Sequence, residues 1–117
     1  MFKVIIVGGE NTGNYKFFCE KCIQCLKNKA KEGGITILST GDKFVDKFAQ
    51  TYGIDVQYFF ADWKRDKKNA LQVRAMQMVE NCDAIIAFND GIKDNQMLNK
   101  FAIEAGKPSR LIALAQA

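Results

Sequence analysis

Short apolar runs alternate with amphipathic stretches along the chain, and this alternation limits the possible folds more than any other feature of the sequence. Short continuous apolar runs fit buried strands, whereas apolar residues that recur every three or four positions fit helices. Glycines and the single proline separate many of these segments. The pattern predicts strands over residues 2–7, 35–39, 54–60, 83–88 and 110–114, and helices over residues 14–31, 43–52, 70–81 and 95–105.

A regular succession of strands and helices predicts right-handed crossovers and a parallel sheet. The runs FKVIIV and DAIIAF are almost wholly apolar, as strands covered on both faces are. We therefore predict one α/β domain over residues 1–117, a doubly wound and mostly parallel five-stranded sheet in the order 3-2-1-4-5 with helices on both faces. The first two helices each end near a glycine, which predicts left-handed C-caps at Gly33 and Gly53.

Three polar, glycine-containing loops follow the first, second and fourth predicted strands. In a doubly wound sheet the carboxyl ends of these strands meet where the winding direction switches, and ligands bind there. Glycines close to helix N-termini also favour phosphate, because N–H groups are free there. The alternative is that these glycines serve only tight turns and that Asp42 only caps a helix. We predict a ligand site formed by Gly8, Gly9, Asn11, Ser39, Thr40, Gly41, Arg74, Asp90 and Gly91.

Gly8 and Gly13 have the five-residue spacing of the phosphate-binding P-loop. The next two residues of a P-loop are Lys and then Ser or Thr, but here they are Asn14 and Tyr15. The dinucleotide fingerprint G-x-G-x-x-G is absent from the chain. We therefore interpret this stretch as another kind of ligand loop.

The composition removes several kinds of chemistry. The chain has no histidine, which excludes Ser-His-Asp and Cys-His catalysis and histidine-ligated zinc. Its net charge of +4 suits an anionic ligand but is too small to predict nucleic-acid binding. No apolar run is long enough to span a membrane, and the N-terminus does not resemble a signal peptide, so we expect a cytoplasmic protein without membrane contact.

Three of the four cysteines form the pattern C-x-x-C-x-x-C within a predicted helix. Thiolates so placed on a regular helix do not converge easily on one metal, whereas cluster ligands usually lie on loops. Together with Phe18 and Leu26 they form an apolar stripe at helical spacing. We therefore expect reduced cysteines in the core, and neither a metal nor a cofactor.

Three further residues have both a functional and a structural interpretation. Arg74 suits a phosphate or carboxylate, but an ion pair with Glu80 or another acid is an equal alternative. Trp63 is either a base-stacking lid, an interface anchor or, as we favour, packed at the edge of the core. Asp46 is either an acid in the pocket or a solvated helix residue. The stripe of Val73, Met76 and Val79 with Met78 predicts a buried helix face.

The chain from KVIIVGGENTGNY through ITILSTGDKFV to the run that ends in AIIAFNDG resembles the SLOG superfamily, and within it the YspA/YpsA-like group of uncharacterised Rossmann-like domains. The resemblance covers nearly the whole chain. Its markers are a Gly-Gly-x-Asn loop, a small-residue loop after the second strand, an Ala-Asp-Trp stretch, a helix with Arg, and an Asp-Gly loop. The matching residues are Gly8, Gly9, Asn11, Ser39, Gly41, Asp46, Ala61, Asp62, Trp63, Arg74, Asp90 and Gly91.

The chain also departs from the pattern of the family. Glu10 stands where many relatives carry Arg, and Thr40, Asp42 and Phe44 replace two small residues and a glycine. A larger side chain fills space that a phosphate would use, and a carboxylate repels it. The Pro-Gly-Gly-x-Gly-Thr-x-x-Glu motif of the related cytokinin-activating phosphoribohydrolases is absent.

The resemblance implies a domain that binds a nucleotide or nucleotide-derived small molecule without catalysis, as a sensor or a sponge. In this hypothesis backbone amides and Arg74 hold the phosphate and Asp90 accepts a hydrogen bond from the sugar. The second hypothesis is a nucleotide hydrolase or phosphoribohydrolase, with Asp46, Glu10 or Asp90 as acid or base. The third is a protein-interaction module with a decayed pocket that binds through Trp63. A homodimer is compatible with each of these hypotheses.

Overall fold

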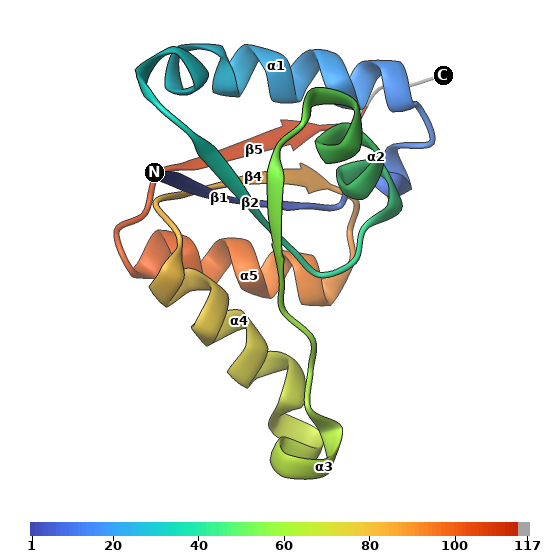
Figure 1. Ribbon diagram of the computed structural model, residues 1–117. Helices are drawn as coiled ribbons and strands as arrows, with labels where there is room; N and C mark the ends of the chain where they lie inside the picture. The colour runs from blue at the N-terminus through green and yellow to red at the C-terminus, as the bar shows by residue number, and fades with distance from the viewer. Residues whose placement is uncertain (115–117) are drawn as a thin grey trace.

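The computed structural model describes residues 1–114 and contains a five-stranded sheet in the order β3-β2-β1-β4-β5 (Figure 1). All four strand pairs are parallel, so the predicted doubly wound α/β fold is confirmed, with a sheet that is wholly rather than mostly parallel. The strands are β1 (Phe2–Val7), β2 (Ile35–Ser39), β3 (Asp55–Tyr58), β4 (Ala84–Asn89) and β5 (Ser109–Ala113).

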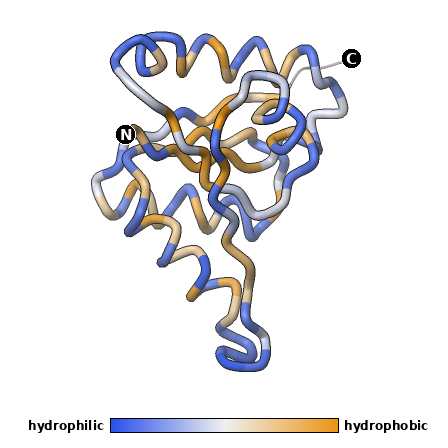
Figure 2. The backbone as a smooth tube through the Cα atoms, in the orientation of Figure 1, coloured by the Kyte–Doolittle hydropathy of each residue, from blue (hydrophilic) through white to orange (hydrophobic). Residues whose placement is uncertain are grey.

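Helices cover both faces of this sheet (Figure 1). On one face lie α1 (Tyr15–Glu32) and α2 (Lys43–Tyr52), and on the other lie α4 (Ala70–Asn81) and α5 (Lys93–Glu104). Shorter helical segments follow β1 and β3: η1 (Glu10–Thr12), α3 (Trp63–Asp66) and η2 (Lys67–Asn69). The segment from β3 to α4 projects away from the sheet, and its tip around α3 is strongly hydrophilic (Figure 2).

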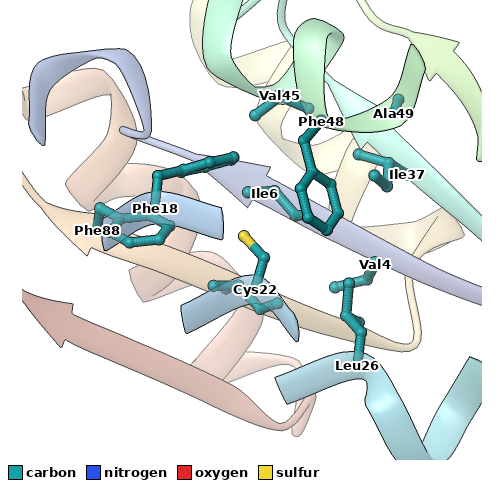
Figure 3. Packing of buried hydrophobic residues seen from close by; sticks show 11 residues of the cluster. Val4, Ile6, Phe18, Cys22, Leu26, Ile37, Val45, Phe48, Ala49 and Phe88 are labelled. Carbon is teal, nitrogen blue, oxygen red and sulfur yellow. The ribbon is translucent and has the colours of Figure 1, made fainter. Parts of the chain in front are cut away.

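The alternation of side chains along β1 divides the core into two clusters, one on each face of the sheet. Val4 and Ile6 pack against α1 and α2, together with Phe18 and Cys22 of α1 (Figure 3). Ile5 and Val7, with Leu38 of β2, pack against α4 and α5. The burial of residues 4–7 on both faces explains the apolar run VIIV in β1.

Local signals in the sequence set the helix ends. The Asn14 side chain accepts a hydrogen bond from the Phe17 amide and begins α1, and Gly53 ends α2 in the predicted left-handed conformation. The prediction for Gly33 was wrong, because its φ of 162° is extended. The chain passes directly from α1 into β2, where the Gly34 carbonyl accepts a hydrogen bond from the Phe2 amide.

The buried face of α4 is rotated from the stripe that the sequence predicts. Met76 is 49% exposed, so its predicted burial was wrong. Met78 and Val79 are buried as predicted, Val73 is half-buried, and the helix also buries Ala70, Arg74 and Ala75. The buried face therefore includes an arginine, whose partner belongs to the site described next.

Candidate functional site

 The loops after β1 and β2 and the start of α5 meet at the carboxyl edge of the sheet and enclose a pocket of about 250 Å³. Of the predicted residues, Gly8, Asn11, Thr40 and Gly41 line it, together with Glu10. The remaining lining residues are Asp42, Ile92, Asp94 and Asn95.

The first two glycines allow β1 to pass close to its neighbours. Gly8 has a φ of +82°, and a Cβ atom there would lie 2.6 Å from the Phe88 carbonyl oxygen. A Cβ atom on Gly9 would collide with the Phe18 ring. Both glycines are therefore required by packing, as well as standing beside the pocket.

Asp90 joins the first loop to the start of α5. Its Oδ2 accepts hydrogen bonds from the side-chain amides of Asn11 and Asn95, each at 2.8 Å. Its Oδ1 accepts from the Ile92 amide at 2.9 Å. Asp90 does not line the pocket itself but a neighbouring hollow of about 140 Å³, so its bonds position the two asparagines of the pocket wall. Gly91 has a φ of +75° and forms the turn beside this carboxylate.

Two carboxylates occupy the N-terminus of α2. Asp42 accepts hydrogen bonds from the amides of Phe44, Val45 and Glu10 at 2.9 to 3.2 Å. Glu10 accepts one from the Lys43 amide at 3.0 Å. The amides that a phosphate would use at this helix end therefore already have anionic partners. Asp42 is the helix cap that the sequence offered as an alternative.

Burial of the Asp42 carboxyl raises its pKa, although its three backbone donors act in the opposite direction. The neighbouring Glu10 charge also raises this pKa. The carboxylate at the base of the pocket is therefore held in an environment that disfavours its charge.

Arg74 lies behind the pocket rather than in its wall. Its side chain is 9% exposed and forms an ion pair with Asp94, which lines the pocket from the first turn of α5. The predicted ion-pair alternative thus has Asp94 as the acid instead of Glu80. The buried Arg74 Nε and Asp94 Oδ1 have no hydrogen-bond partner among residues 1–114.

The second loop supplies Thr40 and Gly41 to the pocket wall, whereas Ser39 is buried beneath them. The Ser39 hydroxyl accepts a hydrogen bond from the Gly41 amide at 3.0 Å and holds the turn. Ser39 therefore shapes the loop and does not reach the pocket.

Asp46 and Trp63 lie outside the pocket. The Asp46 carboxylate accepts a hydrogen bond from the Tyr58 hydroxyl at 3.0 Å. This bond is the main cause of a raised Tyr58 pKa. Trp63 is 57% exposed in the projecting segment (Figure 1), so the favoured interpretation of it as edge-of-core packing was wrong. Trp63 is the first residue of the short α3, which lies at the tip of this segment.

The pocket wall is rich in hydrogen-bond acceptors. Glu10, Asp42 and Asp94 contribute carboxylates, and within residues 1–114 no lysine or arginine lines the pocket. Carboxylates in the wall of a pocket repel a phosphate and accept hydrogen bonds from hydroxyl and amino groups. The arrangement therefore suits a ligand that donates hydrogen bonds.

Three residues of the pocket wall were not predicted as site residues: Ile92, Asp94 and Asn95. The last predicted helix began at residue 95, whereas α5 begins at Lys93, so Ile92 and Asp94 were treated as loop. Asp94 in the first turn is a common signal for the start of a helix and could have indicated the boundary.

A larger cavity of about 470 Å³ lies at the opposite, amino end of the sheet, between α1 and α2. Its wall is mainly apolar and includes Ile23, Leu26 and Phe48. It lacks the convergent polar groups that orient a ligand, so we place the candidate site at the carboxyl edge.

The four cysteines are free thiols, and Cys22 and Cys82 are buried in the core as predicted. Within residues 1–114, no group of three or more cysteine and acidic side chains is arranged to hold a metal ion. In the same part of the chain, no helix has the length and apolar character needed to cross a membrane.

Comparison with family models, curated proteins and solved structures finds no match to this chain.

Proposed function

We propose that the chain binds a nucleotide or nucleotide-derived small molecule, without catalysis, in the pocket at the carboxyl ends of β1, β2 and β4. The observation that carries this proposal is the convergence of three loops on one polar pocket at the switch point between β1 and β4. The resemblance to the SLOG superfamily points to the same class of ligand and remains part of the proposal.

The chemistry of the wall favours the nucleoside part of such a ligand over its phosphate. Arg74 is paired with Asp94, and the amides at the start of α2 are bonded to Asp42 and Glu10. Ribose hydroxyls and base amino groups donate hydrogen bonds, which the carboxylates accept. A volume of about 250 Å³ is also small for a complete nucleotide, given the roughly 300–1,000 Å³ of common ligand sites.

A binding role without catalysis agrees with the way the carboxylates are used. Glu10, Asp42 and Asp90 each accept hydrogen bonds from the protein's own amides. These bonds hold the carboxylates in fixed positions, and the chain has no histidine to share acid–base chemistry with them. A sensor or a sponge for a small molecule fits this arrangement.

Calorimetric titration with ribonucleosides and their 5′-monophosphates tests the proposal. We expect nucleosides to bind, and the added phosphate to give no gain in affinity. The variant Asn11→Ala removes a pocket amide and should weaken binding roughly 2- to 13-fold, the effect of one hydrogen bond. Asn81→Ala, an exposed amide at the end of α4, is the matched control and should bind as the wild type does. Equal affinities of both variants would place the ligand elsewhere.

The exposure of Trp63 favours a second candidate, the protein-interaction module. A tryptophan that is 57% exposed is a typical anchor for a partner. This candidate predicts no affinity for nucleosides, so the same titration separates the two functions.

A further inference from the structure

Phe60 is 68% exposed, more than any other aromatic residue in residues 1–114. It lies two residues beyond the end of β3, on the same side of the chain as Tyr58. Phe59, between them, packs against the cluster under α4 and α5. A large aromatic ring at the end of a well-packed sheet is exposed to water here, and the geometry of the pocket alone does not explain this exposure.

The Phe60 ring lies next to Gly41, one residue of the pocket wall. A Cβ atom built on Gly41 would be 3.7 Å from Phe60 Cε1, and Gly41 lines the pocket. Gly41 has a φ of +100°, which favours glycine at this position. The absence of a side chain there leaves the edge of the ring directly beside the pocket wall.

Two contacts fix the orientation of this ring. The rings of Tyr58 and Phe60 are stacked, with centroids 5.8 Å apart and an interplanar angle of 5°. The Tyr58 hydroxyl in turn donates to Asp46 on α2 at 3.0 Å. Phe60 is therefore backed by a ring that is itself anchored to a helix, which lowers the entropy lost when a ligand stacks on it.

We propose that Phe60 is a stacking platform for the planar base of the ligand, with Tyr58 and Asp46 as its supports. This inference rests on the proposed function and names the part of the ligand that each feature recognises. The carboxylates of the pocket take the hydroxyls of the sugar, and the exposed ring takes the base. Every base has a π-face, so the platform selects a heteroaromatic ring without choosing among bases.

Titration of adenosine and of ribose against matched variants tests this inference. Phe60→Ala and Phe60→Leu should weaken adenosine binding roughly 5- to 150-fold, the range for one base–aromatic contact. Phe60→Trp should retain the affinity, because it keeps a stacking surface. Ribose should bind all four proteins equally. Tyr52→Ala removes an aromatic residue of similar exposure at the amino end of the sheet and should change nothing.

The outcomes separate this inference from the proposed function. Adenosine binding that is unchanged in Phe60→Ala would overturn the platform and leave the pocket intact. A loss of ribose affinity in the same variant would also overturn it, because the ring would then act only by shaping the pocket. If the wild type binds neither adenosine nor ribose, the platform and the proposed function both fail.

Discussion

At the scale of single residues, the pocket is built around the buried carboxylate of Asp42, which accepts hydrogen bonds from the backbone. Asp42 caps α2 and also receives the Glu10 amide from the loop after β1. One side chain thus joins two loops that are far apart in sequence. The role of Asp42 as a helix cap could be predicted from its position just before a helix. Its hydrogen bond to the Glu10 amide could not, because that bond forms only when the two loops meet in the folded protein.

The raised pKa of Asp42 predicts a specific pH dependence of stability. A carboxyl whose folded-state pKa lies above its ordinary value stabilises the fold below that ordinary value, and this contribution is lost as the pH rises through the folded pKa. Asp42→Asn keeps a good helix cap without this titration. The free energy of unfolding of the variant, relative to the wild type, should therefore increase from acid to neutral pH.

Urea unfolding of both proteins at a series of pH values measures this difference. The Glu10 carboxylate is the charged group that faces Asp42, and it is present in both proteins. Two stability profiles that stay parallel across the acidic range would show that Asp42 does not carry a raised pKa.

At the scale of elements, strands and helices set by local pattern were predicted best. The predicted bounds of β1, β2, α2 and α4 agree with the structure, because apolar runs, an Asp cap and a glycine mark them. The short α3 and η2 carry no such pattern and were not predicted. Tyr58 and Phe60 are two residues apart in an extended segment, where such side chains lie on the same side of the chain. This spacing could have indicated that the two rings stack.

The Arg74–Asp94 pair joins α4 to α5 and could not be read from either helix alone. Removing one partner of a buried pair costs roughly 3–5 kcal/mol. Since the Asp94 side chain is 25% exposed, we expect Arg74→Ala to lower the free energy of unfolding by about 3 kcal/mol, at the lower end of that range. Replacing both residues by apolar ones, in Arg74→Met with Asp94→Leu, should recover part of this loss.

Urea denaturation measures these changes, and Lys29→Ala is the control. Lys29 forms an exposed ion pair with Glu32 at 3.3 Å, and such pairs contribute roughly 0–1 kcal/mol. An Arg74→Ala variant no less stable than Lys29→Ala would show that the pair does not hold the two helices together.

At the scale of the whole molecule, the parallel sheet determines where a site can form. The order β3-β2-β1-β4-β5 brings loops from residues 8–13, 39–42 and 89–95 to one edge, and the apolar cavity lies at the other. The topology, and hence the location of the pocket, followed from the alternation of segments. Its acidic character did not, because that depends on which side chains the folded loops turn inward.

The location of bound ligand tests the central claim most directly. Amide chemical shifts of the isotope-labelled protein, recorded during titration with adenosine, report which residues the ligand approaches. We predict shifts at Gly8, Asn11, Gly41, Phe60 and Asn95, with the amides around Ile23 and Tyr52 unchanged. Shifts confined to the amino-end cavity, or no shifts at all, would contradict a nucleoside site at the carboxyl edge of the sheet.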